Sequence, residues 1–345
     1  MSKHKRVSAK LIAAMSMIRR QGAALLYVMR EILPRIIRTG HRPVIFSRYT
    51  GMGDIVCTIP PARELMKRHP GATFIYNCHP DFAPVPRLAG VADHITSFEP
   101  IGIVGHWYRF FLEGFYHFAH GDDTPGRVAS ELMITEFCRQ FDLPVTDQHP
   151  GLRVAPPVLE RMKSLLASRQ LDPTALILIH PGPSWTVKEW PRERWIELVA
   201  ALRAQGHSSI AQLGVARYVA FNQVAISPIP GTVSLVDALS VEECIAVISL
   251  AKVFVGIDSG LLHIAASTRT PSIGLFGSTS PQFFYGSEVR KHFVVTDVEC
   301  AGCHHRQPRL HWITNCPHEI RCMKTLDGGD VFQSCLATLS ASAPP

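Results

Sequence analysis

The chain has 345 residues, of which 46% are hydrophobic and 18% are charged, and its formal net charge is +7. This length suits two domains of roughly 150 residues each, and the composition is typical of globular domains rather than of a disordered protein. Ten of the 35 Lys and Arg residues but only one of the 28 acidic residues lie in residues 1–42, so the body is near neutral and nucleic-acid binding by it is unsupported.

Residues 1–42 form a basic extension in which apolar side chains recur at helical spacing. The stripe breaks only at Gln21 and Gly22, and it consists of Val7, Leu11, Ala14, Ile18, Leu25, Met29, Ile32 and Ile36. Because Arg19 and Arg20 split the apolar run, a transmembrane span is not expected, and the cleavage site of a secretory signal is missing. Such a helix can lie on an anionic membrane, or it can pack on its own body or on a partner.

The first half of the body, residues 43–155, alternates short apolar runs with helical segments. Strands are predicted at 43–49, 72–78 and 93–98, and helices at 60–69 and 129–143. The aromatic-rich segment 105–123 has no clear period and is interpreted either as a lid or acceptor-side insertion or as part of the core. Residues 144–157 contain several prolines and are predicted to be a connector.

The second half, residues 156–345, contains another alternating series. Strands are predicted at 175–182, 208–214, 253–258 and 271–277, and helices at 191–206, 240–251 and 260–268. Ser240 and Glu243 have the spacing of a capping box. Two such series predict an α/β protein with two parallel sheets, and ligands of these sheets lie at the carboxyl ends of the strands, so we expect the site in a cleft between two facing domains.

The stretch "GIDSGLLHIAA" predicts an anion site. A buried strand ends at Asp258, and a helix follows the turn formed by Ser259 and Gly260. The first amides of a helix are unpaired and carry the positive end of its dipole, which suits a phosphate, and a glycine lets the anion approach the backbone. His263 lies one turn into the helix and can reach a phosphate oxygen. The alternative is that Ser259 is a simple N-cap and His263 a core histidine.

The stretch "HPGPSWTVKEWP" follows another predicted strand. Lys188 lies in the loop at the end of this strand, where an ammonium group can neutralise a diphosphate, although a single lysine is more often a solvated surface residue. Ser184 and Thr186 supply hydroxyl groups for the same anion.

The stretch "TGMGDIVCTIP" starts like a dinucleotide-binding loop, but Val56 stands where the third glycine of G-x-G-x-x-G belongs. Gly51 and Gly53 are interpreted as making the turn tight and giving an acceptor access to it. Asp54 is placed to take a proton from an acceptor hydroxyl, or, as spacing alone more often means, to cap the following helix. The sequence has no D-x-D pair for Mg²⁺, no Walker A motif and no G-x-S-x-G, which disfavours NTPases and α/β-hydrolases.

These three motifs, in this order, resemble glycosyltransferase family 9, the heptosyltransferases of lipopolysaccharide core assembly. The matching segments are "GDIVCTIP", "HPGPSWTVKEWP" and "DSGLLHIAASTRTPSIGLFGST", and the resemblance runs from about residue 43 to about residue 330. The resemblance implies a GT-B fold, with two Rossmann-like domains facing across a cleft and the donor held mainly by the second. It also implies an inverting, metal-independent transfer.

The resemblance also implies roles for individual residues. Asp54 would be the general base, and Lys188 would stabilise the leaving diphosphate. Asp258 would lie close to the reacting sugar, while the phosphate site would be lined by Ser259, Gly260, Leu261 and His263, with Ser184 as a weaker contact. Segment 213–223 departs from the family because it contains no acidic residue for the nucleotide ribose, which leaves the nucleotide open.

Some of the cysteines are clustered in the sequence near the C-terminus. Four of the nine lie within a short stretch at x₂, x₁₂ and x₅ spacings, namely Cys300, Cys303, Cys316 and Cys322. Four thiolates can hold a structural Zn²⁺, while buried thiols or a disulfide are the alternatives. An odd number of cysteines and the missing export signal indicate a reducing compartment.

We therefore expect a cytoplasmic enzyme on the inner face of the membrane, held there by residues 1–42. It would transfer a heptose or related sugar from a nucleotide-diphosphate donor, similar to ADP-heptose, to a lipopolysaccharide-type or other surface-glycan acceptor, without a catalytic cofactor. Two alternatives are a non-catalytic nucleotide-sugar binding or scaffold protein of the same fold and a nucleotide-sugar epimerase. The epimerase would form product from the donor alone.

Overall fold

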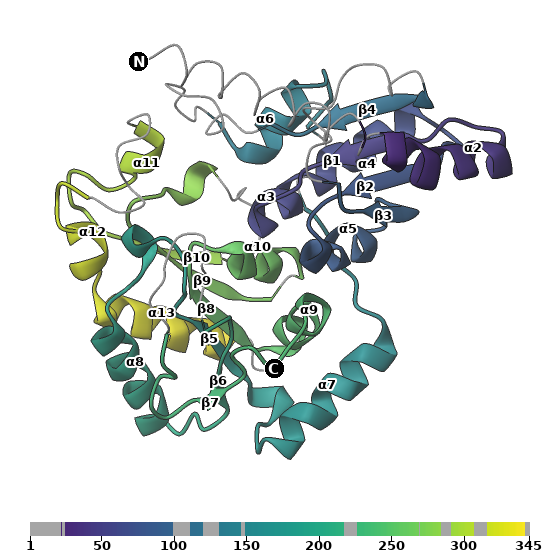
Figure 1. The fold of residues 1–345 in the computed structure, drawn as a ribbon. Coiled ribbons are helices and arrows are strands. Elements are labelled where there is room, and N and C mark those ends of the chain that lie inside the picture. The colour runs from purple at the N-terminus through teal and green to yellow at the C-terminus, as the bar shows by residue number, and fades with distance from the viewer. Residues whose placement is uncertain are drawn as a thin grey trace, which may run out of the picture.

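The computed structural model describes residues 22, 25–98, 111–119, 131–145, 149–216, 226–268, 270–283, 291–306 and 316–341. These residues form two parallel sheets, each covered by helices, as Figure 1 shows. The α/β architecture that the sequence predicts is therefore confirmed.

The first sheet has the strand order β3-β2-β1-β4, and all neighbours are parallel. Its strands are β1 (Val44–Ser47), β2 (Phe74–Asn77), β3 (His94–Thr96) and β4 (Gly114–His117). Every residue of β1 and β2 is buried, because helices or other segments cover both faces of a parallel sheet. Val44 is in register with Phe74 on one side and with Gly114 on the other.

Strand β4 belongs to the aromatic segment that the sequence left without a secondary structure. Phe118, directly after β4, is buried and packs edge-on against Phe137 and Phe141, with ring centroids 5.5 and 5.4 Å apart. In residues 111–119 the core interpretation therefore holds, and the lid interpretation is wrong there because the aromatic side chains pack inside the domain. The remainder of the segment lies outside the described residues.

Helices surround this sheet. They are α3 (Met52–Cys57), α4 (Ile59–Arg68), η2 (Pro80–Phe82), α5 (Pro84–Leu88) and α6 (Met133–Arg139). Helix α4 is the predicted one, and it accommodates Pro60 and Pro61 because they lie in its first turn. Helix α3 was not predicted as a separate element, and it fills the space between the glycine turn and these prolines.

The described part of the basic extension packs on the first sheet. It is helical from Leu25 through η1 (Val28–Ile32) and α2 (Leu33–Thr39), and it ends at Gly40, whose φ of 73° is left-handed. Tyr27, Val28 and Ile32 are buried in one cluster with side chains of β1 and β2. The large apolar side chains on the outside are Leu25, Leu26, Met29 and Ile37, which are 52%, 58%, 53% and 76% exposed. In the described part of the chain, no helix combines the length and apolarity needed to cross a bilayer.

The second sheet has the order β10-β9-β8-β5-β6-β7 and is also parallel throughout. Its strands are β5 (Ile177–His180), β6 (Ile210–Gln212), β7 (Val233–Ser234), β8 (Val253–Ile257), β9 (Ser272–Phe276) and β10 (Lys291–Val295). Four of these match predicted strands, whereas the edge strands β7 and β10 were missed. Strands β5 and β8 are adjacent at the centre, so the loops that follow them meet at one edge of the sheet.

The helices of the second half are α7 (Pro156–Ser168), η6 (Pro173–Ala175), η7 (Thr186–Lys188), α8 (Arg192–Ala204), α9 (Val241–Leu250), α10 (Gly260–Ser267), η8 (Pro281–Phe283), α11 (Cys303–Arg306), α12 (Arg321–Lys324) and α13 (Gly328–Ala341). The predicted capping box starts α9, since the Glu243 amide donates to Ser240 Oγ and the Ser240 amide to Glu243 Oε2. Helices α7, α11, α12 and α13 were not predicted.

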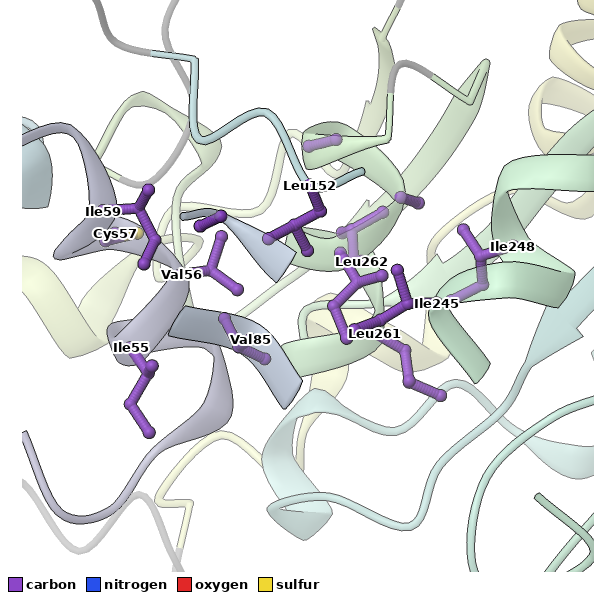
Figure 2. Packing of buried hydrophobic residues seen from close by; sticks show 14 of the residues in the cluster. Ile55, Val56, Cys57, Ile59, Val85, Leu152, Ile245, Ile248, Leu261 and Leu262 are labelled. Atoms are coloured by element: carbon purple, nitrogen blue, oxygen red, sulfur yellow. The ribbon is translucent and has the colours of Figure 1, made fainter. Parts of the chain in front are cut away.

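One apolar cluster joins the two halves. Figure 2 shows Val56 of α3 and Leu152 of the connector on the side of Leu261 and Leu262 of α10. Ile55 of α3 belongs to the same cluster. The connector is hydrogen-bonded to both sides: the Leu152 amide donates to the Ser267 carbonyl at 3.2 Å, and the next amide donates to the Leu88 carbonyl. Helix α3 of the first half therefore packs directly on α10 of the second half.

Candidate functional site

The donor side of the site contains a buried ion pair. Asp258 follows β8 and is 2% exposed. Lys188, at the end of η7, extends from the neighbouring β5 loop and donates from Nζ to Asp258 Oδ2 at 2.7 Å. The same ammonium group lies 4.0 Å from the centroid of the Trp185 ring, in a cation–π contact. The surface-lysine alternative for Lys188 is therefore wrong, because the side chain is 12% exposed and paired.

The electrostatics of this pair favour an ionised Asp258. Burial by itself raises the pKa of its carboxyl group, but the Lys188 ammonium and the nearby His263 outweigh burial, so the pKa lies below its ordinary value. The pair thus places one positive and one negative group at the end of β8. In this arrangement the positive group can bind the diphosphate of a ligand, and the negative group can accept hydrogen bonds from the ligand's hydroxyl groups.

Helix α10 begins beside this pair. Ser259 is its N-cap, but the Ser259 side chain makes no capping hydrogen bond, and its buried Oγ has no partner among the described residues. Leu262 and His263 are the first residues that donate to the Ser259 carbonyl, so the amides of Gly260 and Leu261 precede the intrahelical bonds. The side-chain cap interpretation of Ser259 is therefore wrong, and its hydroxyl group remains available to an anion.

Two further hydroxyl groups were not predicted as site residues. Ser278 and Thr279 follow β9, and each is 3% exposed. Within the described part of the chain, no group lies at hydrogen-bonding distance and angle from either hydroxyl oxygen. Thr279 is close enough to Asp258 to help lower the pKa of that carboxyl group. Their signal in the sequence is the "GST" that ends the segment "DSGLLHIAASTRTPSIGLFGST".

The loop after β5 holds the other predicted donor residues. The Ser184 amide donates to Glu189 Oε1 at 2.9 Å, which closes the loop on itself, while Thr186 starts η7 and is exposed. His180, the last residue of β5, is a buried structural histidine: burial lowers its pKa to about 4, and its Nδ1 lies 3.1 Å from the Leu213 carbonyl oxygen.

The acceptor side contains Asp54 in the first turn of α3. Asp54 caps neither helix, because α3 is capped by Gly51 and α4 by Thr58, both without a side-chain bond. Instead, Arg48 Nη2 donates to Asp54 Oδ2, and the same guanidinium group donates to the Phe118 carbonyl at 3.2 Å. The cap interpretation of Asp54 is wrong for this reason. Arg48 is a site residue that the sequence did not reveal.

A side chain is excluded at the two glycines of this turn for different physical reasons. Gly51 has a φ of 79°, and a Cβ there would lie 2.6 Å from Asp54 Oδ2. A Cβ on Gly53 would lie 2.7 Å from His263 Cδ2, on the other half of the molecule. Gly260 in turn faces the Gly53 amide nitrogen, 3.3 Å from where its Cβ would be. The turn with Asp54 and the start of α10 therefore touch through glycines.

The cysteine-rich segment supports the donor side. The Gly302 amide donates to the Gly277 carbonyl at 2.8 Å, and the His304 amide donates to the Ser278 carbonyl at 2.9 Å. The His304 ring also packs edge-on against Trp185, with centroids 5.3 Å apart. This segment therefore contacts both the turn after β9 and the aromatic ring under Lys188.

The four clustered cysteines influence one another. The pKa of Cys322 is raised to about 12, mainly by burial and to a smaller extent by the negative charge that Cys300, Cys303 and Cys316 carry when ionised. None of the nine cysteines forms a disulfide. Among the described residues, no group of three or more His, Cys, Asp or Glu side chains has the geometry of a metal site.

The region of the expected ribose contact is described only in part. Residues 217–223 lie outside the described residues, but the loop after β6 receives an acid from elsewhere. The Ala216 amide lies 3.1 Å from both carboxylate oxygens of Asp237, a residue in the loop after β7. Segment 213–223 alone could not reveal Asp237, because this residue comes from a later part of the chain and only the fold brings it to the loop after β6.

Two parallel α/β halves that meet at strand ends, with a buried Lys–Asp pair at a helix N-terminus and a carboxylate opposite, define a glycosyltransferase of the GT-B class. The sequence profile of glycosyltransferase family 9 (heptosyltransferase) matches residues 113–313. Lipopolysaccharide heptosyltransferase 1 of Pseudomonas aeruginosa is 31% identical over 310 residues, which cover 75% of this chain and 85% of the relative. The chain therefore belongs to glycosyltransferase family 9.

Solved structures agree with the fold. E. coli ADP-heptose lipopolysaccharide heptosyltransferase II aligns with a TM-score of 0.63 at 16% identity, over 87% of this chain and 99% of that one. The iron-containing dodecameric glycosyltransferase TibC of enterotoxigenic E. coli aligns with a TM-score of 0.66 at 17% identity, over 86% of this chain and 78% of that one. The predicted GT-B fold is thus confirmed, and membership of the family confirms the predicted glycosyltransferase.

Proposed function

We propose that this glycosyltransferase moves a heptose or closely related sugar from a nucleoside-diphosphate donor to a lipopolysaccharide-type acceptor, with inversion and without a catalytic metal ion. The observation that carries the proposal is the contact between the Asp54 turn and the start of α10, beside the Lys188–Asp258 pair. The sugar class and the acceptor class come from the Pseudomonas aeruginosa relative, which is named lipopolysaccharide heptosyltransferase 1.

The chain's own cations neutralise the leaving diphosphate. In the proposed complex, phosphate oxygens accept hydrogen bonds from the Lys188 ammonium, from the amides at the start of α10 and from the Ser259 hydroxyl. Asp258 then releases part of its contact with Lys188 and accepts hydrogen bonds from sugar hydroxyl groups. Because these groups are already fixed and mostly buried, they offset the charge that Mg²⁺ offsets in other transferases.

Asp54 is the proposed general base. Its carboxylate takes the proton of the acceptor hydroxyl while the acceptor oxygen forms a bond to the anomeric carbon. The bond from this carbon to the diphosphate oxygen breaks on the opposite face, and the diphosphate leaves with the electron pair, so the configuration inverts. Arg48 fixes the direction of the carboxylate, since the guanidinium group is itself held by the Phe118 carbonyl.

For the donor we propose ADP-heptose or a close analogue, because the E. coli structural neighbour is an ADP-heptose lipopolysaccharide heptosyltransferase. Segment 213–223 supplies no acid for the ribose. In its place we propose Asp237, whose carboxylate accepts hydrogen bonds from the Ala216 amide and is thereby held beside the loop after β6. A carboxylate there accepts hydrogen bonds from ribose hydroxyl groups, which a deoxyribonucleotide offers only in part.

We also propose that the basic extension rests on the cytoplasmic face of the membrane, where a lipid-linked acceptor is found. One side of the helix from Leu25 to Thr39 packs on the body, while Leu25, Leu26, Met29 and Ile37 are exposed. The nearby arginines Arg30, Arg38 and Arg42 match the negative charge of anionic lipids. This arrangement combines both interpretations of the sequence, since different sides of the helix serve the body and the lipid.

The four clustered thiols are proposed to hold one structural metal ion. Cysteine sulfur is a ligand type that suits Zn²⁺ or iron, and iron is the metal named for TibC, although the four sulfurs do not form a metal site as they are placed in the ligand-free protein. The metal would cross-link the segment that supports the turn after β9. Metal analysis of protein purified without chelator tests this, together with the thiolate-to-iron absorbance that zinc lacks. Less than about 0.1 equivalent of either metal, after expression with both supplied, would contradict it.

The decisive experiment compares Asp54→Asn with the wild type. We expect the variant to lose transfer from ADP-heptose to a heptose-deficient lipopolysaccharide acceptor by about 10²–10⁴-fold, while ADP binding stays within twofold. Undiminished turnover would remove Asp54 from the role of base. A wild type that binds ADP but transfers no sugar would favour the scaffold alternative, and product formed from donor alone would favour the epimerase.

A further inference from the structure

The His263 imidazole is held across the boundary between the two halves. His263 belongs to α10 and is 6% exposed, and its Nδ1 lies 3.6 Å from Cys57 Sγ at the end of α3. The two residues are 206 positions apart in the chain. Cys57 belongs to the apolar cluster that joins the halves, as Figure 2 shows.

For a neutral His263 ring, the direction of this hydrogen bond and the tautomer of the ring determine each other. A thiol in apolar surroundings stays protonated near neutral pH, and its S–H group is a hydrogen-bond donor. A neutral imidazole has one nitrogen that donates and one that accepts. If the thiol donates to Nδ1, this nitrogen carries the lone pair, and the ring hydrogen is on Nε2.

The Nε2 edge of the ring borders the turn that holds Asp54. A Cβ built on Gly53 would lie 2.7 Å from His263 Cδ2 and 3.0 Å from its Nε2. This edge of the ring therefore fits against the turn only because Gly53 has no side chain. Gly260, at the start of α10, faces the same turn. A hydrogen on Nε2 is therefore located where the proposed base and the proposed phosphate site meet.

We propose that Cys57 is a positioning residue for His263: its thiol fixes the Nε2–H tautomer and the direction of the ring, so that His263 donates to the donor diphosphate. The proposal rests on the proposed function for the identity of that ligand. The tautomer itself is a property of the ligand-free protein.

The test measures the tautomer and the affinity separately. Long-range ¹H–¹⁵N spectra of the histidine rings, with His263→Gln for assignment, are recorded for the wild type, Cys57→Ser, Cys57→Ala and the control Cys138→Ala. Calorimetry with ADP gives the affinity of the wild type and the three cysteine variants. Cys138 is a matched control, because it is another buried thiol of the same cluster, with a pKa raised to about 11 by burial.

We expect the wild type and Cys57→Ser to show the Nε2–H tautomer, because a serine hydroxyl also donates. In Cys57→Ala we expect a mixture of tautomers and an ADP dissociation constant raised by about 2- to 10-fold, the equivalent of one hydrogen bond. Cys138→Ala should change neither quantity. This rescue pattern separates the hydrogen bond from the packing of the side chain.

Several results would overturn the proposal. They are an Nδ1–H tautomer in the wild type, a Cys57→Ala spectrum identical to that of the wild type, a Cys57→Ser variant as impaired as Cys57→Ala, or a Cys138→Ala variant with the same loss. A wild type with the Nε2–H tautomer that binds no ADP would contradict the proposed donor instead, while leaving the role of Cys57 in fixing the ring supported.

Discussion

The ion pair between Lys188 and Asp258 gives the sharpest test of how the donor side is held together. The Nζ to Oδ2 distance is 2.7 Å, and the two side chains are 12% and 3% exposed, so solvent screens the pair weakly. In Lys188→Met the carboxylate stays buried without its cation. Removing one partner of a buried pair costs about 3–5 kcal/mol in the free energy of unfolding, and we expect this loss near pH 7.

The dependence on pH has opposite signs in the two proteins. Burial by itself raises the pKa of Asp258, but Lys188 and His263 hold it below its ordinary value. This carboxyl group therefore contributes stability above its unfolded pKa of about 3.9, and the contribution is lost as the pH falls through the lower folded value. Without Lys188 burial dominates, the folded pKa exceeds the unfolded one, and the stability deficit of the variant shrinks as the pH falls from 7 toward 4.

Urea unfolding followed by tryptophan fluorescence, at pH 7.5 and pH 5, measures both effects. Lys163→Met is the control, because Lys163 pairs with Glu160 at 2.8 Å with side chains that are 45% and 69% exposed. Such an exposed pair contributes at most about 1 kcal/mol. The reasoning is refuted if Lys188→Met loses no more stability than Lys163→Met at pH 7.5, or if its deficit is the same at both pH values.

Three further predictions concern the other side of the site and the membrane. In Arg48→Met the Asp54 carboxylate loses the hydrogen bond that orients it. Steady-state assays should then show kcat lowered about 10- to 100-fold, which is part of what a positioned base supplies, while the donor KM stays within twofold. An unchanged kcat would contradict this prediction. Gly53→Ala should lose about 1–3 kcal/mol of unfolding free energy through overpacking, whereas Gly328→Ala, whose Cβ would meet only atoms 3.8 Å away, should not. The double variant Leu26→Glu and Ile37→Glu should weaken co-sedimentation with phosphatidylglycerol vesicles about tenfold or more, and equal sedimentation would disprove the proposed contact.

Regular, locally encoded elements were predictable from the sequence. The buried strands β1 and β8 are continuous apolar runs, and α9 begins with a capping box that fixes its first turn. The edge strands were missed because β7 has only two residues and the β10 residues lack a strong pattern. Helix α7 was missed because its two leading prolines also read as a connector, although proline is tolerated in a first turn.

The candidate site was predictable as a set of loops but not as a set of contacts. The pairing of Lys188 with Asp258 follows from β5 and β8 being neighbours, which strand order in the sequence does not reveal. Arg48 lies at the end of a predicted strand, where a basic residue has no distinctive spacing, and only the fold brings its guanidinium group to Asp54. Cys57 was one of several scattered cysteines until α3 was packed on α10.

Gly53 shows why the two motifs have to be considered together. From the sequence, Gly51 and Gly53 both serve a tight turn, and the left-handed φ of Gly51 agrees with that. Gly53 has no such φ, and the atoms that exclude a side chain there belong to His263. If this steric reason is correct, the two positions are coupled: Gly53→Ala should cost much less stability in a His263→Ala background than in the wild type, by at least about 1 kcal/mol of interaction free energy. Additive losses in urea unfolding would mean that Gly53 is required by its own backbone, and the two motifs would then be independent.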